Sequence, residues 1–252
     1  MIPQLTGARV RGDVDVLSRA GLDLDDFIGE ATESVRRAVP WVGACVGTHD
    51  PATMMLTSAR KYGALKAHNE HDRLFGIIEY GADEPTSFRS LAAGDRRAIG
   101  MHATHADEVD RSERMTRLMR PVYGFADEAR LIFHDGTAAW GCLAIFRGDD
   151  DPMFDDAEIE FLGALSASFA RGVRSGILTR LAHDPVSSGE TGGPAVVIVD
   201  ARDQVAQISV GAEERLEQLR GSAHGGDPLS LVTSLVGAAR RTLSTPEAPP
   251  AR

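Results

Sequence analysis

Apolar residues along the chain switch between helical and strand spacing, which predicts a mixed α+β fold. In the first such segment they recur every three or four positions from Phe27 to Val39, and Pro40 follows directly. A proline removes a backbone donor and cannot continue a helix. The pattern therefore predicts one amphipathic helix over residues 15–39.

Short apolar runs beside turn residues predict the first strands. Residues 41–46 form one such run, and residues 54–58 follow a turn at Asp50 and Pro51. Both runs have the length typical of strands in globular proteins. We expect the first of them to be buried in the interior of a sheet.

A hairpin is the clearest local signal in the chain. Two β-rich runs, residues 129–134 and 137–146, are separated by Asp135 and Gly136. An Asp-Gly pair favours a two-residue turn with left-handed backbone angles. Both faces of the second run are apolar, which predicts a central strand covered on both sides. One of these faces holds Trp140, Cys142, Ala144 and Phe146.

Helical patterns flank the hairpin on both sides. Residues 68–80 predict a helix, and residues 104–119 carry charges of alternating sign, which indicate a solvent-exposed helix that ends before Pro121. After the hairpin, residues 154–178 predict one long helix. Asp155 and Glu158 have the spacing of a capping box at its start.

The long helix carries an apolar stripe with two interpretations. A stripe of this length serves either as packing against the core or as half of a homodimer interface. The stripe consists of Ile159, Leu162, Phe169, Val173 and Ile177.

Composition divides the chain into a main domain over residues 15–181, a Pro/Ser/Gly-rich linker over 182–193, a second segment over 194–243 and a tail over 244–252. The second segment begins with apolar runs at 194–200 and 204–209, which predict two strands. Residues 212–219 and 228–243 predict two helices.

Charge and composition limit the classes of partner. The formal net charge is −10, and no Lys/Arg-rich run or helix-turn-helix signature occurs, so we expect no DNA binding by these residues. No apolar run approaches the roughly 20 residues of a membrane-spanning helix. Two cysteines, Cys45 and Cys142, suit a reducing compartment, so we expect a cytoplasmic protein without membrane contact.

No catalytic constellation is evident. The chain has no nucleophile elbow, P-loop or dinucleotide fingerprint, and both cysteines fall in predicted buried strands. Histidines in the middle of the chain lack the cysteine pair or the H-E-x-x-H pattern of a metal site. These are His68, His71, His102, His105 and His134. We expect no metal, no cofactor and no enzymatic activity, with a haem ligand among these histidines as an alternative.

Several local motifs together resemble the GAF-like sensory region of actinobacterial LuxR-type helix-turn-helix regulators. The strongest stretch is residues 137–147, TAAWGCLAIFR. The remaining matching positions are Arg37, Val39, Pro40, Trp41, Cys45, Asp50, Pro51, Ala52, Thr53, Asn69, Glu70, Asp72, Phe75, Trp140, Gly141, Phe154 and Glu158. Residues 193–219 resemble the opening of a PAS-type domain, such as these regulators carry next.

The resemblance implies a GAF-like antiparallel sheet flanked by helices, followed by a partial PAS-like α/β segment. It implies a sensor of a transcriptional regulator that binds an unknown small molecule and acts as a homodimer. Alternatives are a ligand-free interaction module, a haem or redox sensor, or a GAF-type sulfoxide reductase. The aromatic and polar residues expected to line the pocket are Phe75, Tyr80, Phe88, Arg89, His102, Tyr123, Phe125 and Trp140.

Overall fold

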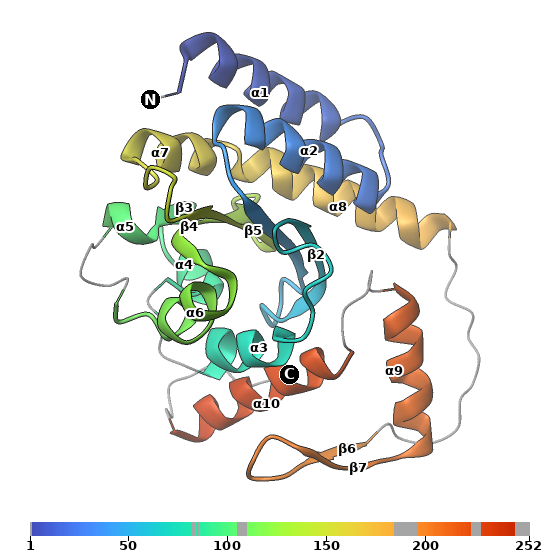
Figure 1. Cartoon of the computed structure of the whole chain (residues 1–252). Helices are drawn as coiled ribbons and strands as arrows, with labels where there is room; N and C mark the ends of the chain where they lie inside the picture. The colour runs from blue at the N-terminus through green and yellow to red at the C-terminus, as the bar shows by residue number, and fades with distance from the viewer. Residues whose placement is uncertain are drawn as a thin grey trace.

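A five-stranded antiparallel sheet forms the centre of the computed structural model, which describes residues 2–81, 84, 86–104, 110–183, 196–222 and 228–244. Helices cover both faces of this sheet (Figure 1). In spatial order the strands are β2 (Leu56–Gly63), β1 (Gly43–His49), β5 (Ala139–Gly148), β4 (Phe125–His134) and β3 (Ala98–Gly100). Every neighbouring pair is antiparallel, so the predicted α+β class with an antiparallel sheet and flanking helices is confirmed.

The predicted hairpin is confirmed as β4 and β5, with β5 in the middle of the sheet. Its predicted two-residue turn is wrong, because the last strand pair is His134 with Ala139 and four residues lie between them. The side chain of Asp135 explains the longer loop. Its Oδ1 accepts hydrogen bonds from the backbone N–H groups of Thr137 and Ala138, each 2.9 Å long.

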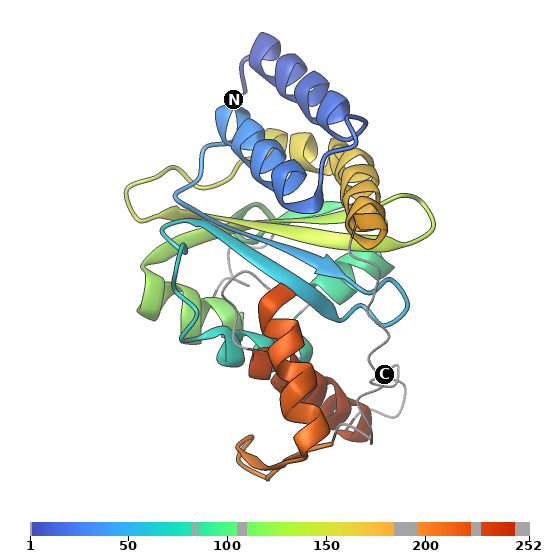
Figure 2. The same ribbon diagram turned by 90° about the vertical axis from the view of Figure 1, so that its right-hand side faces the viewer.

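The first helical layer packs on one face of the sheet (Figure 2). Apolar residues on the inner side of its helices meet Ala129, Leu131, Phe133, Leu143 and Ile145 of the sheet in one buried cluster. The layer consists of α1 (Gln4–Leu17), α2 (Leu24–Ala38), α7 (Asp156–Ala164) and α8 (Ser166–His183).

The sequence predicts two long helices where the structure has four, so both predictions are wrong in extent. Residues 15–39 are divided between α1 and α2 because Gly21 adopts a left-handed φ of 68° and Asp23 caps the start of α2. Residues 154–178 are divided between α7 and α8 at Leu165. There the Ser166 hydroxyl donates to the Ile132 carbonyl at 2.6 Å, which fixes the start of α8 to β4. The predicted capping box of Asp155 and Glu158 is present.

The apolar stripe of the predicted long helix faces the interior of this chain. Leu162, Phe169 and Val173 are fully buried, and Ile159 and Ile177 are half-buried against the same cluster. All five side chains therefore serve the core of a single chain. Homodimerisation stays a prediction, and it has to use other surfaces.

The second layer lies on the opposite face of the sheet. Its apolar residues pack against Ile132, Cys142, Ala144 and Phe146 in a second buried cluster. The layer consists of α3 (Asp72–Gly81), α4 (Phe88–Ala93), α5 (Met101–Thr104), η1 (Met115–Met119) and α6 (Arg120–Tyr123).

The prediction of one exposed helix over residues 104–119 is wrong. Residues 105–109 lie outside the described part of the chain, and residues 115–119 form the π-helical turn η1. Met115, Leu118 and Met119 are buried, so this segment belongs to the core. Pro121 lies in the first turn of α6, where its missing N–H costs nothing, and does not end a helix.

The C-terminal segment has the predicted order of two strands and two helices. These elements are the hairpin β6 (Val197–Val199) and β7 (Val205–Ile208), α9 (Val210–Ser222) and α10 (Pro228–Ser244). Helix α10 packs on α3 of the main domain (Figure 2). The two helices approach so closely that a Cβ atom on Gly237 would lie 3.4 Å from the backbone nitrogen of Gly81.

The predicted domain boundary at residue 15 lies inside α1. Helix α1 begins at Gln4, before the predicted boundary at residue 15, and packs on α2 and α8. Helix α8 ends at His183, and the rest of the predicted linker lies outside the described residues. No helix in the described ranges is both long and apolar enough to cross a membrane.

Packing between α2 and α8 depends on glycine. A Cβ atom on Gly172 of α8 would overlap the ring of Phe27, which is 1% exposed and packs edge-on to Phe169 at 5.9 Å between centroids. By contrast, a Cβ atom on Gly29 of α2 would meet nothing within 4 Å.

We predict that Gly172→Ala lowers the free energy of unfolding by about 1–3 kcal/mol, because overpacking outweighs the better helix propensity of alanine. Gly29→Ala is the matched control and should raise the same quantity by roughly 0.5–1 kcal/mol. Urea unfolding monitored by circular dichroism measures both. Equal effects of the two substitutions would show that the contact with Phe27 does not limit the packing.

Candidate functional site

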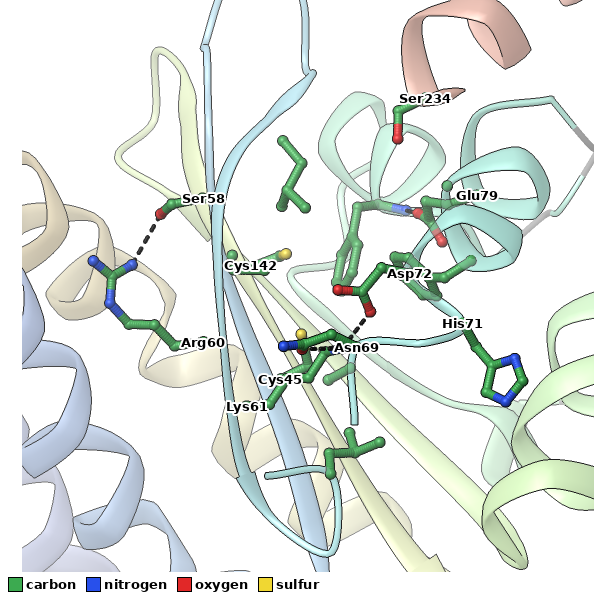
Figure 3. A pocket seen from close by; sticks show the side chains of 18 of the residues that line it. Cys45, Ser58, Arg60, Lys61, Asn69, His71, Asp72, Glu79, Cys142 and Ser234 are labelled. Atoms are coloured by element: carbon green, nitrogen blue, oxygen red, sulfur yellow. Dashed lines mark hydrogen bonds and ion pairs between the residues drawn. The ribbon is translucent and has the colours of Figure 1, made fainter. Parts of the chain in front are cut away.

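A cavity of about 560 Å³ lies between the sheet and the second helical layer. Strands β1, β2 and β5 form one wall, and α3 forms the opposite wall (Figure 3). Ser234 brings α10 to the same cavity, so residues far apart in the chain share its wall.

Four of the eight residues predicted to line the pocket do line this cavity: Phe75, Tyr80, Phe88 and Tyr123. The hydroxyl of Tyr80 accepts a 2.9 Å hydrogen bond from the backbone N–H of Leu56. That bond ties α3 to the edge strand β2.

The other four predicted residues lie off the cavity wall. Phe125 is buried behind the wall, where its ring stacks on Tyr123 at 5.8 Å and on Phe146 at 4.7 Å. His102 is exposed on α5, and Arg89 is half-buried on α4.

Trp140 packs on the opposite face of the sheet from the cavity, so the prediction that it shares a face with Cys142 is wrong. The strand pairing skips Trp140, because Phe133 pairs with Gly141 and His134 with Ala139. This register shift reverses the alternation of side chains at the start of β5. The Trp140 Nε1–H then donates a 2.9 Å hydrogen bond to Asp135.

Apolar side chains make up most of the cavity wall. They come from β2 and the turn that follows it, and from α3, α4, η1, α6 and β5. The residues are Leu56, Leu65, Phe75, Phe88, Leu118, Met119, Tyr123, Ala144 and Phe146. Such a wall with a few polar groups is typical of small-molecule sites.

Gly47 contributes to the floor of the cavity by having no side chain. A Cβ atom there would overlap Leu56 and lie 3.1 Å from the sulfur of Cys142. The glycine therefore leaves room for two side chains that face the cavity.

Charged groups on the wall, apart from the exposed Lys66, are paired within the protein. Lys61 Nζ forms an ion pair with Asp72 and donates a 3.0 Å hydrogen bond to the Asn69 side chain (Figure 3). Arg60 pairs with Asp25. These contacts tie β2 to α3 and to α2, and they neutralise the charges at the cavity edge.

Glu79 extends from α3 towards β4, where Arg130 Nη2 lies 2.8 Å from its Oε2. Burial alone would raise the pKa of Glu79. Arg130, Arg114 and the backbone N–H of Phe88 together hold that pKa below its ordinary value. Glu79 is therefore an ionised carboxylate whose charge is met inside the protein.

Glu79 belongs to a larger buried ion network. Arg114 lies 2.9 Å from Glu128 and 3.5 Å from Glu84, and both arginines are fully buried. Arg130 also stacks on the ring of Phe88, with its guanidinium 3.6 Å from the ring centroid. The network joins α3 and the chain around Glu84 to β4 and η1.

His49 lies at the end of β1 on the cavity wall and is 3% exposed. Its Nδ1 is buried without a hydrogen-bond partner. Burial lowers the pKa of His49 to about 4; Glu79 raises that pKa in part, and Arg130 lowers it. The imidazole is therefore neutral at physiological pH.

Cys45 and Cys142 both face the cavity as free thiols (Figure 3). In the sheet Cys45 lies opposite Ala144, and Cys142 lies opposite Gly47. Burial raises the pKa of Cys45 to about 11 and also raises that of Cys142. Both thiols are protonated at neutral pH, the form with little nucleophilicity.

Among the histidines considered as metal ligands, His68 and His71 both pack edge-on to the ring of Tyr123, at 6.1 and 5.9 Å between centroids. His68 contacts Glu70 at 2.9 Å, and His134 accepts a hydrogen bond from Gly136 in the hairpin loop. His105 lies outside the described residues. In the ranges that the structure describes, no group of three or more His, Cys, Asp or Glu side chains could hold a metal ion.

Comparison with known proteins finds no matching family model and no matching curated protein. Solved structures are similar in part. One is a phycoerythrobilin-bound GAF domain from a cyanobacterial phytochrome, with 13% identity and a TM-score of 0.46 over 71% of this chain and 98% of that one. A GAF domain/HD domain protein from Geobacter sulfurreducens matches with 16% identity and a TM-score of 0.43, over 65% of this chain and 98% of that one.

A third structure is an N-acylhomoserine lactone dependent LuxR family transcription factor from Burkholderia cenocepacia. It has 15% identity and a TM-score of 0.40, over 70% of this chain and 99% of that one. With TM-scores below 0.5, these likenesses assign no ligand and no activity to the present chain. The fold class rests on its own sheet order and helical layers.

We predict that Arg130→Met lowers the free energy of unfolding by about 3–5 kcal/mol, because Glu79 and Glu128 lose a buried cation. Arg171→Met is the control, since Arg171 pairs with Asp15 at 2.8 Å on the surface and both side chains are more than 40% exposed. Its loss should cost at most about 1 kcal/mol. Urea unfolding of both variants checks the difference, and similar costs would contradict a structural role for the network.

We predict that His49 makes stability fall as pH is lowered from about 6.5 to about 4. The folded-state pKa lies near 4 and the ordinary value is 6.5, so only the unfolded chain binds the extra proton in this interval. The loss should reach up to about 3 kcal/mol relative to the His49→Phe variant, and the difference should be constant above pH 7. Parallel pH profiles of the two proteins would show that His49 does not titrate in this way.

Proposed function

We propose that this chain is the ligand-binding sensory module of a regulatory protein. The observation that carries the proposal is the cavity of about 560 Å³, which has a mainly apolar wall between the sheet and α3. A space of this size suits one small organic molecule. The GAF-like resemblance of the sequence supports the same assignment.

Helix α10 connects this cavity to the β6–β7 hairpin of the C-terminal segment. Ser234 on its inner side lines the cavity, and Arg240 further along donates to the carbonyl of Asp200 at 2.9 Å and pairs with Asp203 at 3.0 Å. A ligand that prefers one position of α10 shifts the population of that position and of the β6–β7 hairpin attached to it. Such a coupling would carry the signal, whether the regulator acts as a homodimer or alone.

We propose binding and no catalysis at this site. The thiols of Cys45 and Cys142 are protonated at neutral pH, which disfavours the sulfoxide reductase alternative. The buried charged groups on the cavity wall, including Glu79, are held in ion pairs. These charged side chains thus stabilise the fold and are not available to act on a substrate.

The proposal predicts that an uncharged dye such as Nile red binds one per chain with increased fluorescence. Ala144→Phe fills part of the floor of the cavity and should weaken this binding at least tenfold, while Ala144→Ser adds one heavy atom and should leave it within about twofold. Fluorescence titration measures the affinities, and thermal unfolding confirms that both variants are folded. Equal binding by wild type and Ala144→Phe would place the dye elsewhere and overturn the proposal.

A further inference from the structure

His49 is a polar side chain on the cavity wall whose hydrogen-bonding capacity is unused. It is 3% exposed, makes no hydrogen bond to any described residue, and has a buried Nδ1 without a partner. A buried polar group without a partner has lost its hydration and gained no protein contact in return. A residue in this state gains if a ligand supplies the missing partner.

Position on the strand brings His49 to the same side of the sheet as the cavity. Cys45, Gly47 and His49 alternate along β1, and all three line the cavity. The ring of His49 also packs against Phe88, with 5.9 Å between centroids. The imidazole is thus fixed by its neighbours, which makes it a defined contact point.

Charges on the wall leave no place for a charged group inside the cavity. Lys61 is paired with Asp72, Arg60 with Asp25, and Glu79 with Arg130. Lys66 is the remaining charged residue of the wall, and its side chain is exposed to solvent. An ion placed beside His49 would lose its hydration without gaining a counter-ion.

The charged groups that act on His49 do not offer a counter-ion to a ligand either. Glu79 and Arg130 act on its ring from α3 and β4, but each is already bound to the other at 2.8 Å. The neutral imidazole offers one N–H donor and one nitrogen acceptor. Its natural partner is a neutral group that can donate or accept, such as a hydroxyl.

We infer that the cavity selects an uncharged, largely apolar molecule whose hydroxyl or similar neutral polar group hydrogen-bonds to His49. The inference rests on the proposed function, because it concerns the same cavity. It adds the chemical class of the ligand and the residue that determines specificity. Acids, amines and phosphorylated metabolites are excluded from the space beside His49.

The test uses four ring compounds of one shape: naphthol, methylnaphthalene, naphthoate and naphthylmethylamine, all substituted at the same ring position. They are titrated against the whole chain by competition with Nile red at neutral pH. We expect naphthol to bind roughly 3- to 10-fold more tightly than methylnaphthalene, which is the worth of one hydrogen bond. Naphthoate and naphthylmethylamine should bind at least tenfold more weakly than naphthol.

Two substitutions assign the preference to His49. His49→Phe keeps a ring of similar size and should bind methylnaphthalene as well as wild type, but without the preference for naphthol. His49→Gln retains a donor and an acceptor and should recover part of that preference. Thermal unfolding establishes that both variants are folded.

The outcomes separate the inference from the proposed function. If methylnaphthalene binds and naphthol shows no advantage, or if His49→Phe keeps the advantage, the role of His49 is overturned and the binding site stands. Binding of naphthoate as tight as that of naphthol overturns the selection against charge. If none of the four compounds binds wild type, the proposed function fails together with the inference.

Discussion

The buried ion network around Arg114 and Arg130 is the constraint that holds the second helical layer on the sheet. Both arginines are fully buried, and carboxylates from three separate parts of the chain surround them. Removing a charge from water is expensive, and the cost is offset only if every partner is in place. The network therefore fixes α3, the chain at Glu84 and η1 against β4 as one unit, and the cavity is the space that this unit leaves over the remaining strands.

The two faces of the sheet consequently differ in how they are built. One face is covered by α2 and α8, whose apolar residues form one buried cluster with the sheet and whose glycines allow a close approach. The other face has charged groups near β4 and open space near β1. Ion pairs need defined partners at defined distances. The network therefore fixes the distance of α3 from the sheet more strictly than apolar side chains would.

Sequence patterns predicted β1, β2, β4 and β5 because alternation and turn residues are local signals, but they missed β3, which has only three residues. They failed where a single residue breaks a longer pattern, as Gly21 and Leu165 do, since the periodicity on both sides continues. The burial of Arg114 was missed because charges of alternating sign are typical of exposed helices. Arg114 lies within such a run, and only the fold shows that Glu84 and Glu128 meet it.

Candidate site residues divide in the same way. Phe75, Tyr80, Phe88 and Tyr123 could be predicted as a group because aromatic residues near loops often line pockets, whereas Trp140 was misplaced by a register shift that no local pattern shows. His49 was overlooked because it follows the predicted strand and precedes a turn. Extending the alternation of Cys45 and Gly47 by two residues would have placed it on the same face.

The contact of α10 with α3 sets the order in which the parts of this protein are completed during synthesis. The sheet and both of its helical layers are encoded before residue 184, so they are able to fold while the remainder is still being translated. The wall to which Ser234 belongs is missing at that stage and is added last, when Gly237 docks beside Gly81. A chain still being synthesised thus has its core before it has a complete binding site, and it first becomes able to respond to a ligand once α10 has docked on α3.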